Sequence, residues 1–179
     1  MVYLSNYQSP FGVISLISDE NNLLALWFEG QKYSQSLYQA GSLQKGSSPV
    51  LTASKKWLDD YFANKKPSST SLPLAPIGGE FRQQVWKLLL QIPYGEVTTY
   101  GEIARQVAKI QGRESMSSQA VGGAVGHNPI SIIIPCHRVV GSNGSLTGYA
   151  GGINRKIKLL ELEGLDLSRF SIPKKGTAL

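Results

Sequence analysis

The sequence predicts a protein of two parts, a small α+β domain followed by a mostly helical domain. Short apolar runs separated by turn residues open the chain, and apolar residues at helical spacing dominate its second half. Between them, residues 64–79 are rich in Pro, Ser and Gly, a composition typical of a linker. The length of 179 residues accommodates two small domains. We therefore expect one domain over residues 1–75 and another over residues 76–179.

The first domain begins with three expected strands. Apolar-rich runs at residues 2–8, 13–18 and 23–28 are separated by two short turns, which predicts an antiparallel meander. A helix should follow, with Thr52 as its N-cap and its end near Ala63. The apolar face of this helix comprises Leu51, Trp57, Leu58, Tyr61 and Phe62.

The second domain opens with helical periodicity. Apolar residues recur at helical spacing across residues 81–92, and Pro93 ends the run because proline cannot continue a helix. Thr99 and Glu102 have the spacing of a capping box, in which each side chain binds a backbone N–H at the start of a helix. This pair predicts a helix over residues 100–108.

A short helix rich in small residues should come next. After a polar connection at residues 109–116, Ser117 is placed to cap a helix over residues 118–125, and Asn128-Pro129 would end it. The small residues are Ala120, Gly122, Gly123 and Ala124. Two successive helices can form a helix-turn-helix, and small side chains would let the second helix approach a nucleic acid groove. Tight helix–helix packing explains the composition equally well, and the connection is longer than the roughly three or four residues usual for the motif.

The last part of the chain combines a buried segment, a turn, a loop and a helix. Residues 130–134 form an apolar run, residues 141–144 form a turn, and the glycine-rich residues 146–152 could form a wing. Asn154 is expected to cap the final helix, and Gly164 to close it. The apolar face of that helix includes Ile157, Leu159, Leu160 and Leu162.

Cys136 is the only cysteine, and His127 and His137 are the only histidines. One cysteine excludes an internal disulfide framework and any multi-cysteine zinc site, and we expect no metal centre. A single cysteine has three ordinary interpretations: buried filler, incidental surface residue or nucleophile. The composition alone leaves all three open.

The positive charge is concentrated in the second half of the chain. The net charge of +6 divides into +1 for residues 1–75 and +5 for residues 76–179. This distribution favours a polyanionic partner such as nucleic acid, although many basic proteins bind none. No apolar run approaches the roughly 18 to 20 residues of a membrane helix, and the N-terminus lacks the features of a signal peptide. We expect a cytoplasmic protein with no membrane partner.

The segment Pro135-Cys136-His137-Arg138 resembles the hallmark of the O6-alkylguanine-DNA alkyltransferases, the methylated-DNA–protein-cysteine methyltransferases. The similarity extends through most of the second half, at residues 81–89, 92–104, 120–141, 144–152 and 158–164. The first half resembles the family only in its strand–strand–strand–helix layout. The resemblance implies an α+β, ribonuclease-H-like N-terminal domain and a mostly helical C-terminal domain with a winged helix-turn-helix. Its recognition helix, residues 118–125, would enter the minor groove.

The resemblance implies a chemical role for five residues. Cys136 would be the nucleophile and alkyl acceptor, and only its thiolate is strongly nucleophilic. His137 is the natural base, but side chains of adjacent residues diverge, so the family places a water between the two. Glu163 would orient His137, Tyr100 would donate a proton to the leaving guanine, and Asn128 would act as a hinge. Without the resemblance, His137 is more simply a core histidine, Tyr100 a half-buried aromatic and Asn128 a helix C-cap.

Further positions correspond to the family's base pocket and DNA contacts. The Val139 carbonyl, Tyr149 and Ser142 would read the guanine edge, and Gly101 would contact DNA. Gly151-Gly152 would let the backbone approach closely. The position before Ala120 is commonly arginine in the family, inserted where the flipped base has left the stack, whereas here it is Gln119. Because glutamine carries no charge, we expect weaker DNA binding or base extrusion with catalysis retained.

The implied partner is double-stranded DNA with a flipped O6-alkylguanine, and O4-alkylthymine is a possible further substrate. Nothing in the scheme removes the alkyl group from sulfur, so each molecule would react once, without a cofactor, as a monomer. Three other interpretations remain. An alkyltransferase-like lesion sensor would lack the cysteine, and a winged-helix regulator would leave the PCHR segment unexplained. A cysteine–histidine hydrolase would need His127 close to the sulfur.

Overall fold

The computed structural model describes residues 1–31 and 43–173, which form two compact units. Unit 1 comprises Met1–Ile77 together with Pro129–Ile133. Unit 2 comprises Gly78–Asn128 and the described residues from Ile134 onward. No helix in the described ranges has both the length and the apolar character required to cross a membrane.

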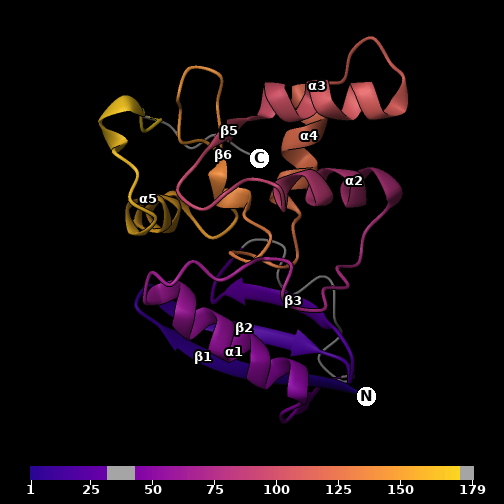
Figure 1. Ribbon diagram of the computed structural model, residues 1–179, viewed down its shortest axis with the longest axis vertical. Helices are drawn as coiled ribbons and strands as arrows, with labels where there is room; N and C mark the ends of the chain where they lie inside the picture. The colour runs from indigo at the N-terminus through magenta and orange to yellow at the C-terminus, as the bar shows by residue number, and fades with distance from the viewer. Residues whose placement is uncertain (32–42, 174–179) are drawn as a thin grey trace. The chain divides into compact units, whose positions relative to one another are not determined.

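Unit 1 is built on a four-stranded mixed sheet (Figure 1). The strands are β1 (Val2–Ser9), β2 (Gly12–Ser18), β3 (Leu23–Phe28) and β4 (Leu43–Lys45), in the order β3-β2-β1-β4. The first three form the predicted antiparallel meander, which is confirmed. The fourth, which pairs parallel to β1, was not predicted, because three residues are too few to show a periodic pattern.

Helix α1 (Pro49–Phe62) lies across one face of this sheet (Figure 1). The predicted cap was wrong: Ser48, not Thr52, is the N-cap, and its side chain accepts a hydrogen bond from the Leu51 N–H. Proline at the first helical position is favourable because its fixed φ suits a helix and its missing N–H would have no partner there. The buried face of the helix comprises Val50, Leu51, Ser54, Trp57, Leu58 and Tyr61.

A segment from far along the sequence completes unit 1. The Leu26 N–H donates to Pro129 O at 2.9 Å, and the Ser131 N–H donates to Leu26 O at 2.9 Å. The Ser131 hydroxyl also donates to Gln31 Oε1 at 3.2 Å. Within this segment Ile132 has a φ of 70°, which is costly for a β-branched residue and persists only where surrounding structure enforces it.

Unit 2 is mostly helical, as predicted. Its helices are α2 (Glu80–Leu89), α3 (Tyr100–Gln111), α4 (Ser118–Gly126) and α5 (Ile153–Leu162). Helix α4 packs against both α2 and α3 (Figure 1). The Trp86 indole N–H supports this packing by donating to Ala124 O at 2.9 Å, with the ring fully buried.

The ends of these helices agree only in part with the prediction. Thr99 and Ser117 are N-caps as predicted, but the Glu102 carboxylate binds Arg105 instead of completing the capping box. Helix α3 extends to Gln111 and ends at left-handed Gly112. Asn154 is not a cap, because α5 begins at Ile153 and its N-cap is Gly152, two residues before Asn154.

Two short strands join the parts of unit 2 that flank the cysteine. Strand β5 (Thr98–Thr99) pairs parallel with β6 (Val139–Val140), directly after the 3₁₀ helix η2 (Cys136–Arg138). A small apolar cluster of Val140, Leu146 and Leu160 holds β6, the following loop and α5 together. The loop expected to form a wing, residues 146–152, contains no strand in the described structure.

Candidate active site

Cys136 begins η2 and is almost completely buried, with 4% of its surface exposed. The preceding chain turns sharply, because the Cys136 N–H donates to Ile134 O at 2.8 Å. The Asn128 side chain fixes the same turn, since its Nδ2 also donates to Ile134 O, at 2.8 Å. Asn128 thus connects the residues just after α4 with the segment that carries the cysteine.

His137 and Glu163 form a fully buried pair beside Cys136. The distance from His137 Nε2 to Glu163 Oε2 is 2.5 Å. An ionised carboxylate can only accept hydrogen bonds, so Nε2 carries the proton of a neutral imidazole and Nδ1 is left with a lone pair. Nδ1 has no hydrogen-bond partner among the described residues. The carboxylate therefore fixes the tautomer of the ring, which leaves Nδ1 as its basic nitrogen.

The Glu163 carboxylate is held from several sides. Arg138 donates to it through Nε at 2.7 Å and Nη2 at 3.2 Å, and the Gly95 N–H donates at 3.1 Å. Burial raises the pKa of Glu163, but the interactions with His137 and Arg138 outweigh burial and hold the pKa below its usual range. Arg138 is itself fixed by Ile92 O at 2.7 Å. Glu163 therefore stays ionised and immobile.

The environment sets the protonation states of the reactive pair. Burial raises the pKa of the Cys136 thiol, while the Asn128 side chain and the charge of Lys156 act in the opposite direction. Burial lowers the pKa of His137 more than Glu163 raises it. At neutral pH the site therefore holds a protonated thiol and a neutral imidazole, so the thiolate has to be generated by transfer of a proton to a base.

Two tyrosines lie near this group. The Tyr100 hydroxyl donates to Thr147 O at 3.1 Å and Gly148 O at 3.3 Å. Burial and then the charge of Cys136 raise the pKa of Tyr100, which keeps its phenol protonated. The Tyr149 ring stands edge-on to His137, with centroids 6.5 Å apart. The structure thus brings Cys136, His137 and both tyrosines into one region of unit 2.

The other predicted site residues are partly or fully exposed, or contribute a backbone group. Gln119 is exposed in the first turn of α4, and Ser142 is exposed in the turn after β6. Gly101 is half-buried in the first turn of α3, where an added Cβ would lie 3.9 Å from Ser118 Oγ. The Val139 carbonyl accepts a hydrogen bond from Lys156.

Arg138 and Lys156 were not assigned roles from the sequence. Arg138 was part of the recognised PCHR segment, but its contact with Glu163 depends on folding across 25 residues. Lys156 carried a local signal in the sequence, because it precedes Leu159 and Leu160 by three and four positions and so falls on the apolar face of the last helix. In the structure it is fully buried. A lysine on the apolar face of a helix is unusual unless it has a buried partner.

His127, the other histidine, stands at the end of α4, and its Nδ1 lies 2.7 Å from Gly123 O. It therefore caps a helix, whereas a cysteine–histidine hydrolase would need it beside the sulfur. Within residues 1–31 and 43–173, no three His, Cys, Asp or Glu side chains lie close enough to hold a metal ion.

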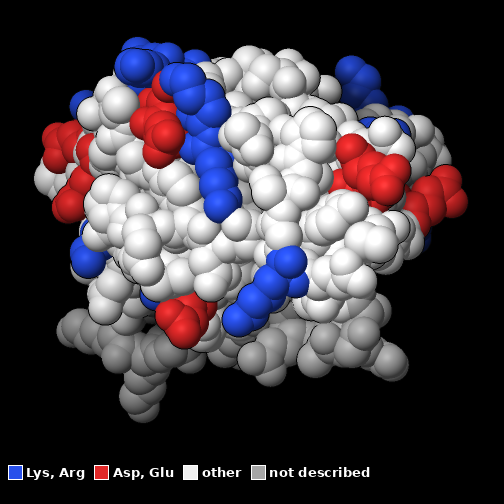
Figure 2. Space-filling model, turned by 90° about the horizontal axis from the view of Figure 1, so that it is seen from below, with Lys and Arg blue, Asp and Glu red and all other residues white. Residues whose placement is uncertain are grey.

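A basic surface hollow of about 480 Å³ lies between α3 and the start of α4. Its lining includes three basic residues, Arg105, Lys109 and Arg113, and one acidic residue, Glu114, and Gly101 also borders it. On the face seen in Figure 2, by contrast, basic and acidic side chains are interspersed among wide uncharged areas. The hollow contains none of the residues around Cys136, so it is a candidate for binding phosphate groups and not for chemistry.

Known proteins resemble both parts of the chain. Residues 2–76 match the family described as 6-O-methylguanine DNA methyltransferase, ribonuclease-like domain, and residues 80–165 match its DNA binding domain. The methylated-DNA–protein-cysteine methyltransferase of Methanosarcina acetivorans is 42% identical over 163 residues, covering 91% of this chain and 99% of the relative. That of Haemophilus influenzae is 37% identical over 162 residues, covering 90% and 86%.

The fold agrees with the sequence comparison. The crystal structure of Mycobacterium tuberculosis OGT in complex with DNA is 40% identical to this chain, with a TM-score of 0.77, and the match covers 94% of both chains. The predicted combination of an N-terminal domain built on a sheet and a helical DNA-binding domain is thereby confirmed. The chain belongs to the O6-methylguanine DNA methyltransferase family.

Proposed function

We propose that this chain repairs alkylated DNA by moving the alkyl group from O6 of guanine to Sγ of Cys136. The observation that carries the proposal is the buried His137–Glu163 pair next to the single cysteine. It provides a neutral base of fixed tautomer at a thiol whose pKa is raised by burial. The family's methylated-DNA–protein-cysteine methyltransferases support the same chemistry.

The reaction balances without a cofactor. His137 Nδ1 takes the thiol proton through a bridging water, and Glu163 stabilises the resulting imidazolium. The Sγ thiolate attacks the alkyl carbon opposite O6, so an S–C bond forms while the C–O6 bond breaks. The electron pair stays on guanine, which takes a proton from the Tyr100 hydroxyl. The Tyr100 phenolate then regains a proton from the His137 imidazolium through solvent, so that both side chains return to their starting forms. The products are guanine and S-alkylcysteine, so each protein molecule reacts once, without S-adenosylmethionine.

We assign DNA recognition to α4 and the hollow beside it. Gly122 and Gly123 each cost the helix about 1 kcal/mol relative to alanine. Neither is required for internal packing: a Cβ at Gly123 would meet nothing within 4 Å, and one at Gly122 would make only ordinary contact with Tyr100. This observation favours close approach of DNA over tight helix packing, the alternative left open by the sequence. Arg105, Lys109 and Arg113 would bind phosphate groups beside α4.

The substrate is double-stranded DNA, and α4 enters its minor groove. Because O6 of guanine lies within the base stack, the nucleotide has to flip out, at a cost of a few kcal/mol. Gln119, exposed on α4, would occupy the space left by the flipped base, and Asn128 would tie α4 to the cysteine segment. The Val139 carbonyl, Ser142 and Tyr149 would contact the base, and O4-alkylthymine is a further substrate to test. Unit 2 holds all these residues, so a monomer suffices.

The proposal is tested with a duplex that carries O6-methylguanine with a labelled methyl group. The label should move to the wild-type protein and remain on DNA with Cys136→Ser. His137→Gln should transfer it at least about 100-fold more slowly, the usual contribution of a positioned base. Retention of the label on DNA by the wild type, or transfer to Cys136→Ser, would overturn the proposal. A wild type that binds the lesion without reacting would be a damage sensor.

A further inference from the structure

The interior of unit 2 holds more positive than negative charge. Among its described residues, Arg138 and Lys156 are buried cations, and Glu163 is the buried carboxylate. Arg138 is already paired with Glu163. Lys156 has no carboxylate within ion-pair distance in the described part of the chain. One buried cation therefore lacks an anionic partner when Cys136 is a neutral thiol.

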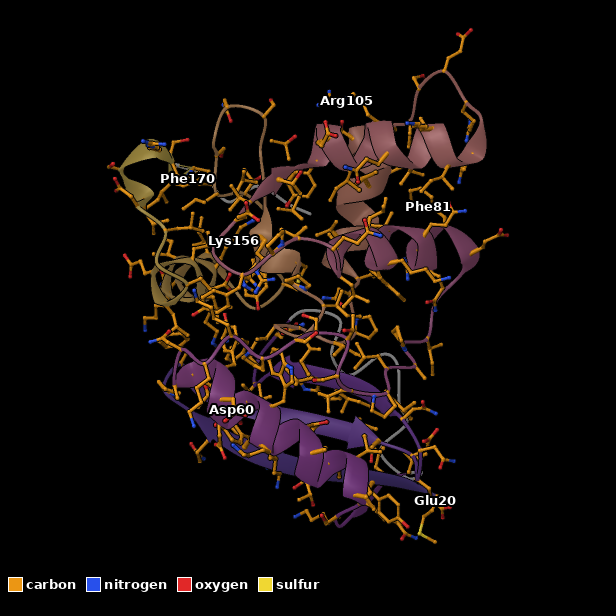
Figure 3. The ribbon with its side chains drawn as sticks, in the orientation of Figure 1. Glu20, Asp60, Phe81, Arg105, Lys156 and Phe170 are labelled. Carbon is orange, nitrogen blue, oxygen red and sulfur yellow. The ribbon has the colours of Figure 1, made fainter. Side chains whose placement is uncertain are left out.

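Lys156 is held firmly in this position. It lies in the first turn of α5 (Figure 3), which packs against η2, and its side chain is fully buried. Its Nζ donates to Val139 O at 2.5 Å and to Thr147 O at 2.7 Å. Burial lowers the pKa of Lys156 to about 8, so the ammonium form still predominates at pH 7. Two backbone carbonyls thus fix a cation close to the cysteine helix.

A buried ammonium is costly unless an opposite charge compensates it. Two neutral carbonyl groups satisfy two of its three N–H donors but supply no negative charge. Ionisation of Cys136 would supply that charge. On the basis of the alkyl transfer proposed above, we propose that Lys156 is the fixed counter-charge that stabilises the Cys136 thiolate, and thus a positioning residue for the reaction.

The reaction places two requirements on the site: a base has to remove the thiol proton, and a cation has to stabilise the thiolate. His137 removes the proton, and the imidazolium that results is bound, like Arg138, to the Glu163 carboxylate. The thiolate then needs a cation outside this group, and Lys156 is the buried cation that has no carboxylate within ion-pair distance in the described part of the chain. Lys156 also shares Thr147 O with the Tyr100 hydroxyl, so the same lysine orders the backbone to which the proposed proton donor is bound.

The other groups around Cys136 do not replace this charge. The Asn128 amide lowers the pKa of the thiol through a hydrogen bond but is neutral. The Tyr100 phenol is protonated, and the neutral His137 supplies no positive charge before it has taken the proton. Arg138 faces the Glu163 carboxylate. Only Lys156 is a resident cation whose charge acts directly on the thiol.

The first test is a titration of the thiolate absorbance near 240 nm without DNA. Because the chain has one cysteine, subtracting the Cys136→Ser spectrum isolates the signal of Cys136. Lys156→Gln keeps hydrogen-bond donors but removes the charge, so the midpoint should rise by about 1 to 3 pH units. Lys156→Arg, which keeps the charge, should shift it less. Lys158→Met, on the exposed side of α5, is the charge-matched control and should leave it unchanged.

A wild-type midpoint in a folded Lys156→Gln protein would overturn the proposal. If that variant does not fold, reciprocal coupling gives a second test. The pKa of Lys156, followed by NMR, should be lower in Cys136→Ser than in the wild type, because Cys136 and Lys156 lose their protons as a coupled pair and serine cannot take the negative charge that stabilises the ammonium; equal values would also reject the role. Neither measurement uses DNA, so failure here is distinct from failure of alkyl transfer, which the label experiment detects.

Discussion

Glu163 accepts hydrogen bonds from His137, Arg138 and the Gly95 backbone, so a single buried carboxylate ties two other segments of unit 2 to the end of α5. Removing its charge leaves the buried Arg138 guanidinium without an anionic partner, which typically costs about 3 to 5 kcal/mol. It also frees the ring of His137 to adopt another tautomer. At the scale of single residues, stability and chemistry therefore depend on the same group.

We expect Glu163→Gln to lower both the free energy of unfolding and the rate of alkyl transfer, the latter by about 100-fold. The pKa of Glu163 is depressed in the folded state, so its stabilisation is complete above the unfolded pKa of about 4.3 and is lost as the pH falls. The difference in unfolding free energy between wild type and variant should therefore shrink by up to about 1.4 kcal/mol per pH unit below about 4.

Denaturant unfolding from pH 7 to pH 3, together with single-turnover rates, measures both effects. Glu161→Gln is the matched control, because Glu161 lies on the same helix with its side chain exposed. A pH-independent difference between Glu163→Gln and wild type would contradict the assignment of an ionised, buried Glu163.

Gln119 stands where the family resemblance leads us to expect an arginine. It is exposed in the first turn of α4 and brings no positive charge to the DNA. We expect Gln119→Arg to bind duplex DNA more tightly and to steepen the salt dependence of binding by about one charge. Gln44→Arg, which adds the same charge to the exposed side of β4 in unit 1, is the control. Equal affinities of Gln119→Arg and wild type in a fluorescence titration would reject the idea.

Helix α4 is the element in which stability and proposed function conflict. Gly123 has room for a side chain, since an added Cβ would meet nothing within 4 Å. We expect Gly123→Ala to raise the free energy of unfolding by about 0.5 to 1 kcal/mol and at the same time to weaken DNA binding. Thermal denaturation and DNA titration of the same protein measure both.

The control for this helix is Thr52→Ala, at an exposed position on α1 in unit 1. It should also stabilise a helix, by about 0.5 kcal/mol, but leave DNA affinity unchanged. If Gly123→Ala binds DNA as tightly as wild type, the glycine has no role in close approach and α4 is not the surface that meets DNA.

The helices themselves were predictable from the sequence, because amphipathic spacing is a local property. The residues at which the helices start were only partly predictable. Thr99 and Ser117 were identified correctly as caps, Thr99 from its spacing to Glu102 and Ser117 from its place directly before the helix rich in small residues. Thr52 and Asn154 were wrong because other cap-compatible positions, Ser48 and Gly152, lie a few residues earlier. The Ser48-Pro49 pair was the available signal, since proline favours the first helical position.

At the scale of the whole molecule, the parts that escaped prediction are those that depend on distant contacts. Residues 129–133 belong to unit 1 because they bond to β3, about a hundred positions earlier in the chain. Likewise, the roles of Arg138 and Lys156 depend on acceptors brought close by folding. The contact between His137 and Glu163, by contrast, was expected from the sequence, because the family resemblance supplied the long-range information that periodicity cannot.

The consumption of one protein molecule per repaired base is the central claim at this scale. Its most direct test is intact-mass spectrometry after incubation with a large excess of duplex DNA containing O6-methylguanine. We predict a gain of one methyl group per protein molecule, located on the peptide that bears Cys136 and absent from Cys136→Ser. Continued loss of O6-methylguanine beyond one equivalent, or a protein of unchanged mass, would contradict the account.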